Sequence, residues 1–190
     1  MKVLSRSLCA AVLLAVSLPA TSRAGIFTSS DVPQGIWDYH TTTSTVTVPA
    51  MTVSDVNVII TTLYHTWMSD LRIWITSPQN TSVFLFWHYD GGSDNMINTT
   101  FDDSASTHIS AGWPPYGGSY IPHMPLSAFI GENAGGVWTL SISDDVGWDG
   151  GSLEAWALEI NGQAVPEPAT ALLVAAGLAA AALLRRRRAV

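Results

Sequence analysis

Cysteine is almost absent from this sequence of 190 residues, which contains only Cys9. Cys9 lies in an N-terminal stretch with a basic start (Lys2, Arg6), an apolar run over residues 8–18 and the ending Ser22-Arg23-Ala24. This order is typical of a secretory signal peptide, so we predict a signal helix over residues 1–24 and cleavage after Ala24. The exported body would then have no thiol, which excludes disulfide bonds and thiol catalysis.

Basic residues are almost missing between residues 25 and 164. This segment contains 14 acidic residues and one base, Arg72, because the other seven Lys and Arg lie in the two ends of the chain. Its net charge of about −13 disfavours binding to nucleic acid and to anionic membranes. The same charge attracts divalent cations, although solubility outside the cell would explain it equally well.

The body also lacks an amphipathic helix of useful length, and period-two patterns of apolar residues take its place. These patterns predict strands over 42–48, 53–62, 71–76, 82–87, 99–103, 137–143 and 154–160. The first is expected to be an edge strand stopped by Pro49. The predicted fold is an all-β, antiparallel β-sandwich of the jelly-roll, galactose-binding-like type, with a closed barrel as the alternative.

The residues expected to point into the core alternate along three of these strands. They are Leu71, Ile73 and Ile75; Trp138, Leu140 and Ile142; and Trp156, Leu158 and Ile160. We therefore divide the chain into a signal peptide (1–24), a loose N-terminal segment with the edge strand (25–52), the sandwich (53–162) and a tail (163–190).

The tail combines Pro166-Glu167-Pro168, an apolar run over 171–184 and four arginines at 185–188. The run predicts a transmembrane helix, and the arginines would lie in the cytoplasm. A plain membrane anchor is one interpretation. The order of the three parts, however, resembles the PEP-CTERM sorting signal of Gram-negative bacteria. That resemblance implies an exosortase as partner, cleavage near Pro166, Glu167 and Pro168, and a final place on the cell surface or in the extracellular matrix.

Several segments of the body, taken in order, resemble the P domain (P/Homo B domain) of kexin- and furin-type subtilisin-like proteases. They are His65 with Asp70-Leu71 and Ser77-Pro78; Thr100-Phe101-Asp102-Asp103; Tyr120-x-Pro122 with Pro125-Leu126; and Gly136-Val137-Trp138 with Asp144 and Trp156-x-Leu158. The resemblance implies a jelly-roll sandwich without catalytic residues that packs on a protease domain and tunes its calcium dependence. A separate subtilisin-like protease is therefore one possible partner.

Catalytic motifs are missing from the sequence. It contains no Gly-x-Ser-x-Gly elbow and no His-Glu-x-x-His helix. About thirty residues between the signal peptide and Val56 are too few for a protease domain. We therefore expect no enzyme activity and interpret His65, which precedes Asp70 at the start of a strand, as a scaffold residue.

Calcium is the expected cofactor. Hard cations take six to eight oxygen ligands, and aspartates at strand ends could supply several of them. Asp70 with Asp102 or Asp103 is the first candidate group, and Asp144, Asp145 and Asp149 form the second. Each of these aspartates taken alone is more often a turn-former.

Eight tryptophans favour a rival function. Trp67, Trp74, Trp113 and Trp148 are expected near loops or on an outer face, where they could stack on sugar rings as in carbohydrate-binding modules. An exopolysaccharide would then be the partner. The simpler explanation is that sandwich cores and sheet faces use tryptophan for packing. The sequence thus predicts a secreted, non-catalytic surface module, with carbohydrate binding and protease association as alternatives.

Overall fold

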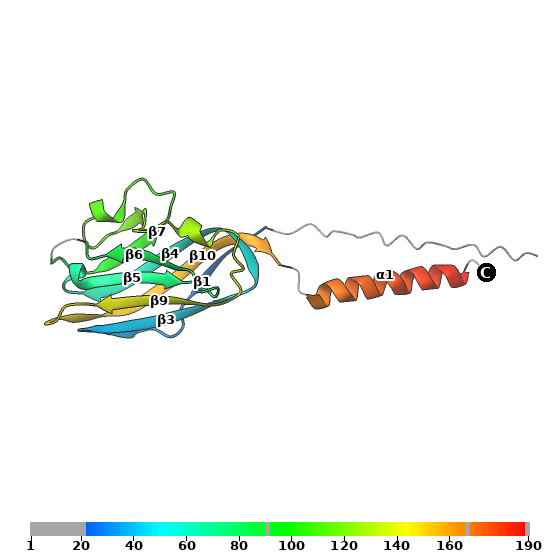
Figure 1. The fold of residues 1–190 in the computed structure, drawn as a ribbon, viewed down its shortest axis with the longest axis horizontal. Helices are drawn as coiled ribbons and strands as arrows, with labels where there is room; N and C mark the ends of the chain where they lie inside the picture. Colours follow the sequence, from blue (N-terminus) through cyan, green and yellow to red (C-terminus); the bar gives the residue numbers. More distant parts are fainter. Residues whose placement is uncertain (1–21, 90–91, 166–167, 189–190) are drawn as a thin grey trace, which may run out of the picture.

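The computed structural model describes residues 22–89, 92–165 and 168–188. Two β-sheets pack face to face as a sandwich, and neither closes on itself (Figure 1). One sheet has the order β1-β10-β4-β7-β8, with β2 also paired to β10, and the other has the order β3-β9-β5-β6. Every pairing is antiparallel except that of β7 with β8. The predicted jelly-roll sandwich is confirmed.

The strands are β1 (Ser22–Thr28), β2 (Gln34–Trp37), β3 (His40–Val48), β4 (Met51–His65), β5 (Leu71–Thr76), β6 (Ser82–Trp87), β7 (Met96–Phe101), β8 (Gly118–Tyr120), β9 (Gly136–Asp144) and β10 (Gly150–Ala164). Three short 3₁₀ turns, η1 (Met68–Asp70), η2 (Ile109–Ala111) and η3 (Leu126–Phe129), lie in the connections. All seven predicted strands are present, and β3 forms an edge as expected.

The core lies between the two sheets and follows the alternation of the strands. Leu71, Ile73 and Ile75 are fully buried, whereas the residues between them are partly exposed. Burial of each such side chain stabilises the fold by roughly 1.5–3 kcal/mol. The predicted inward residues of β9 and β10 are buried as well. Ser141 and Ser143 of β9 and Ala157 of β10 are also buried, so burial alternates less strictly there than in β5.

The N-terminal segment is more ordered than its composition suggests. The sequence predicts that this segment is loose ahead of the edge strand, but Gly25–Thr28 belongs to β1, which pairs with β10. Ser22–Ala24, assigned to the signal peptide, also lies in β1. The rest of the predicted signal peptide, residues 1–21, lies outside the described residues. Pairing with the long β10 explains the order, because tertiary contacts outweigh weak local propensity.

The tail forms a helix, α1 (Pro168–Arg188), as predicted. The helical part of that prediction is confirmed. Among residues 22–89, 92–165 and 168–188, no helix is long and apolar enough to cross a membrane. Pro166 and Glu167 of the sorting motif lie outside the described residues, and Pro168 is the first residue of α1.

Strand ends from both sheets meet at one end of the sandwich. β4 ends at His65, which pairs with Gly151 near the start of β10, and β9 ends at Asp144, which pairs with Leu71 at the start of β5. Gly151 is required there, because a Cβ at this position would lie 1.8 Å from the Tyr64 carbonyl oxygen. This close approach brings the turns 66–70 and 145–149 together.

Candidate cation-binding pocket

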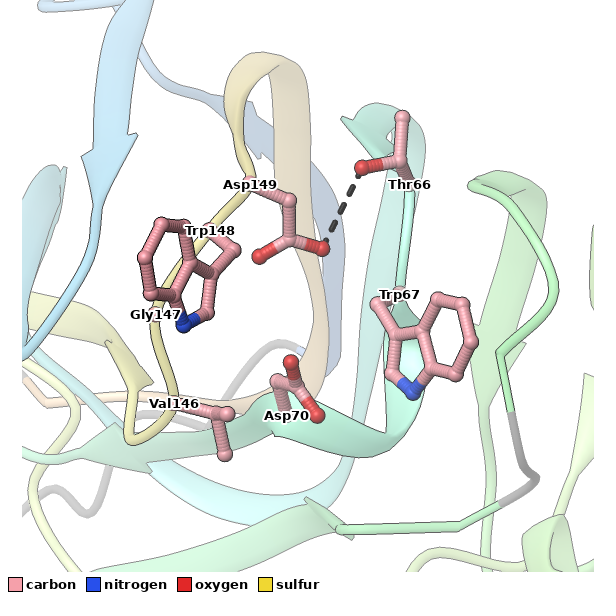
Figure 2. Close-up of a pocket in the computed structure, with 7 residues that line it drawn as sticks. All are labelled: Thr66, Trp67, Asp70, Val146, Gly147, Trp148 and Asp149. Atoms are coloured by element: carbon pink, nitrogen blue, oxygen red, sulfur yellow. Dashed lines mark hydrogen bonds between the residues drawn. The ribbon is translucent and has the colours of Figure 1, made fainter.

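A pocket of about 520 Å³ lies between the turns 66–70 and 145–149. Figure 2 shows Trp67 and Trp148 on opposite sides of it, with the carboxylates of Asp70 and Asp149 between the two indoles. The lining residues are Thr66, Trp67, Asp70, Val146, Gly147, Trp148 and Asp149. The pocket is therefore formed by acidic groups flanked by aromatic ones.

A histidine and two carboxylates converge next to this pocket. One ligand atom each from His65, Asp144 and Asp149 lies within 4.8 Å of the other two. His65 and Asp144 are buried, and Nε2 of His65 lies 3.2 Å from Oδ2 of Asp144. The other ring nitrogen, Nδ1, lies 3.0 Å from the Trp67 carbonyl oxygen and 3.2 Å from the Trp67 amide nitrogen, so it has a partner whether or not it carries a hydrogen.

The two carboxylates of this cluster differ in how many of their oxygens accept a hydrogen bond. Oδ1 of Asp144 accepts from the Val146 amide and Oδ2 from His65, so both oxygens have partners. Oδ2 of Asp149 accepts from the Thr66 hydroxyl at 3.2 Å. Oδ1 of Asp149 is buried and accepts no hydrogen bond from any residue that the structure describes. Burial of a carboxylate oxygen without a hydrogen-bond partner destabilises the folded state. A ligand bound to this oxygen would remove that cost.

The charges in the pocket are poorly balanced. Burial raises the pKa of Asp70, and the nearby carboxylates of Asp149 and Asp144 raise it further. Burial also raises the pKa of Asp144, against the lowering effect of its hydrogen bonds to Val146 and His65. Both groups are therefore harder to ionise than usual, and a bound cation would relieve this.

The predicted calcium groups are only partly assembled. Asp70 lies with Asp144 and Asp149, members of the second predicted group, rather than with Asp102 or Asp103. Asp102 follows Phe101, which pairs with Val58. Val58 is seven residues from the end of β4, a distance of about 23 Å along a strand.

Asp102 and Asp103 have local structural roles instead. Oδ1 of Asp102 accepts from the amide and hydroxyl of Ser104. The two oxygens of Asp103 accept from the Leu126 and Ser127 amides, each at 2.8 Å. These contacts cap turns. The expected grouping of Asp70 with Asp102 or Asp103 is therefore corrected: Asp70 lies with Asp149 instead.

Asp145 is not part of the pocket either. Its oxygens bind the Arg72 guanidinium, with Oδ1 at 2.8 Å from Nη2, and Nε2 of His88 lies 3.2 Å from Oδ2. The hydrogen bond from Arg72 holds the pKa of Asp145 below its usual range despite partial burial. Asp144 and Asp145 are adjacent where β9 ends, so their side chains diverge to opposite sides.

The four predicted stacking tryptophans separate into three places. Trp67 and Trp148 flank the pocket, Trp74 packs on Phe84 with ring centroids 5.6 Å apart, and Trp113 lies exposed in another loop. Sequence reasoning did not single out Trp37, which is also exposed. It also treated His65 only as scaffold, although its place beside Asp144 depends on strand pairing that no local pattern reveals.

The pocket offers little for catalysis and much for cation binding. Thr66 carries the single hydroxyl among the lining residues, and this hydroxyl donates to Asp149 rather than to His65. A nucleophile activated by His65 is therefore not part of the arrangement. Asp144 and Asp149 belong to the converging cluster, and Asp70 lines the pocket together with Asp149. Their carboxylate oxygens could hold a hard divalent cation, and His65 could join them for a softer one.

Comparisons with known proteins bear on most of the chain. The family model of the proprotein convertase P-domain matches residues 53–160, and the PEP-CTERM protein-sorting motif matches residues 164–188. No curated protein matches the sequence. Similar solved structures include a serine protease of Aeromonas sobria in complex with the chaperone ORF2, and the serine protease of Aeromonas sobria.

Both structures share 19% sequence identity with this chain. The first alignment covers 78% of this chain and 28% of the other, with a TM-score of 0.49. The second covers 77% and 28%, with a TM-score of 0.47. This chain thus spans about 28% of the length of the structures that it matches.

Proposed function

The chain belongs to the proprotein convertase P-domain family, and from this premise we propose that it is an exported, non-catalytic module that binds calcium between Asp70 and Asp149. The P-domain is followed by the PEP-CTERM motif, so the module is an accessory domain that is secreted and sorted by an exosortase. Its final place would be the cell surface or the extracellular matrix of a Gram-negative bacterium.

The observation that carries the calcium proposal is the buried Oδ1 of Asp149, which accepts no hydrogen bond from the described residues. Asp149 lines the same pocket as Asp70 (Figure 2) and belongs to the cluster with His65 and Asp144. Three carboxylates near one point supply several oxygens for a hard cation, and water would complete the six to eight ligands that calcium takes. His65 is a poor calcium ligand and would remain the hydrogen-bond partner of Asp144.

A calcium ion at this position would have a structural effect. Asp70 directly precedes β5 of one sheet, Asp144 ends β9 of the same sheet, and Asp149 directly precedes β10 of the other sheet. An ion bound by these residues would join the two layers where no disulfide is available. Binding to the folded state alone would stabilise it by about 2.7 kcal/mol at a calcium concentration one hundred times the Kd.

The test is thermal unfolding of the purified protein after treatment with EDTA and again after calcium is restored. We expect the melting temperature to fall in EDTA and to recover with calcium in excess over the chelator. The Asp149→Asn variant should show the same melting temperature in both conditions. If the melting temperature of the unmodified protein is the same with EDTA and with calcium, the calcium proposal is refuted.

A further inference from the structure

Trp148 is presented to solvent in an unusual way. Its side chain is 99% exposed, and its backbone has φ of 96°, a region that residues other than glycine rarely adopt. The Trp148 amide donates to Oδ2 of Asp38 at 3.0 Å, and a Cβ on the preceding Gly147 would lie 3.0 Å from the Tyr39 ring. The turn therefore holds an indole in water at a conformational cost, which points to a binding role.

Trp67 faces it across the pocket. Its side chain is 49% exposed, and one part of the indole is supported by Gly92, where an added Cβ would lie 2.5 Å from Cζ2. A glycine at this position allows the backbone to approach the ring closely. Figure 2 shows the Asp70 carboxylate between the two indoles, which makes this a site with two aromatic surfaces and an acidic centre.

We infer that this pocket binds a neutral sugar, and the inference rests on the proposed calcium site. The sugar ring would stack its C–H face on Trp148 or Trp67, and two neighbouring hydroxyls would replace water on the calcium ion. Indoles offer large apolar surfaces that need little ordering on binding. Carboxylates from Asp70 and Asp149 would fill only some of the six to eight ligand positions of calcium, so the others would be open to water or to sugar hydroxyls.

The negative charge of the pocket and its surroundings favours uncharged ligands over acidic ones. Asp70, Asp144 and Asp149 give the pocket a negative potential, and the surrounding body has only Arg72 as a lysine or arginine. Acidic polymers would be repelled from this surface, whereas uncharged hydroxyls can bind both calcium and carboxylate oxygens. A neutral polysaccharide with neighbouring hydroxyl groups is therefore the ligand class that suits the pocket.

The experiment is affinity electrophoresis of the full chain in native gels that contain soluble mannan, a neutral polymer rich in neighbouring hydroxyls. Gels without mannan provide the reference mobility, and each gel is run with calcium and with EDTA. Trp148→Ala tests the pocket. Trp113→Ala is the matched control, because Trp113 is 74% exposed but lies in a different loop and does not line the pocket.

We expect mannan to retard the unmodified protein and Trp113→Ala in calcium, with an affinity at least tenfold lower for Trp148→Ala. Retardation should disappear in EDTA. The inference is overturned if mannan causes no retardation in calcium, if Trp148→Ala is retarded as strongly as Trp113→Ala, or if retardation persists in EDTA. Calcium binding measured separately without mannan distinguishes a failed sugar site from a failed calcium site.

Discussion

Replacement of Asp149 by asparagine should stabilise the metal-free protein while it removes the response to calcium. In the metal-free state, Asp149 places a third carboxyl group near Asp70 and Asp144. The pKa values of Asp70 and Asp144 are raised by burial and by their acidic neighbours, Asp149 among them. Asparagine has nearly the same shape and can still accept the hydrogen bond from Thr66. Its amide hydrogens would face the two remaining carboxylates, so repulsion is replaced by attraction.

The magnitude follows from the separation of the charges. Oxygens of Asp144 and Asp149 lie within 4.8 Å of each other, and two unit charges at that distance repel by about 3.5 kcal/mol at an effective dielectric constant of about 20. His65 and solvent offset part of this repulsion. A net gain of roughly 1–3 kcal/mol in the free energy of unfolding is expected, which corresponds to a rise of roughly 3–10 °C in melting temperature.

The gain should depend on pH in a defined direction. Because the folded-state pKa values of Asp70 and Asp144 are raised, protonation of these groups favours the folded state, and that contribution is lost as the pH rises through their folded-state pKa values. The variant should therefore exceed the unmodified protein most at neutral pH, and the difference should shrink in acid, where the neighbouring carboxyls are neutral.

The assay is thermal unfolding by circular dichroism in EDTA and in calcium, at neutral and at acidic pH. Asp55→Asn is the matched control, since it removes the same charge from an exposed residue of β4 whose Oδ2 accepts from Asn161. A lower melting temperature for metal-free Asp149→Asn than for Asp55→Asn would refute the reasoning. So would a calcium response of Asp149→Asn equal to that of the control.

Three further outcomes are expected. His65→Ala leaves the buried carboxylate of Asp144 without its histidine partner, and urea denaturation should show a loss of about 3 kcal/mol in unfolding free energy; a loss below about 1 kcal/mol would show that the pair is unimportant. Arg72→Leu should destabilise the protein at neutral pH. Because Arg72 lowers the pKa of Asp145, that contribution is present above the unfolded-state pKa and is lost as the pH falls through the folded-state value, so the difference from the unmodified protein should shrink below about pH 4; a difference that is constant with pH would contradict this. Purified protein should not cleave casein with or without calcium, and cleavage that His65→Ala abolishes would show that the module is an enzyme.

The strands could be predicted from the sequence because their signal is local. In β5, the alternation of Leu71, Ile73 and Ile75 with partly exposed residues directly reports which face packs on the other sheet. The same rule could have separated Asp144 from Asp145, since adjacent residues of an extended chain point to opposite sides. Treating the two as one ligand group overlooked that information.

The pocket itself could not be predicted, because it depends on which strand ends meet in space. Asp70 and Asp149 are 79 positions apart in the sequence, and both Asp102 and Asp144 follow or end strands in a similar local pattern. The pairing of Leu71 with Asp144 and of His65 with Gly151 brings Asp70, Asp144 and Asp149 to the same end of the sandwich. Asp102 is left about 23 Å away along the strand direction. Long-range pairing of this kind leaves no mark in hydrophobic periodicity.

Isothermal titration of calcium into the EDTA-treated and dialysed full chain tests the central claim most directly. The proposal predicts saturable binding of one calcium ion by the unmodified protein and by Asp55→Asn, and none by Asp70→Asn or Asp149→Asn. Absence of binding by the unmodified protein, or equal binding by all four proteins, would contradict a calcium site between Asp70 and Asp149.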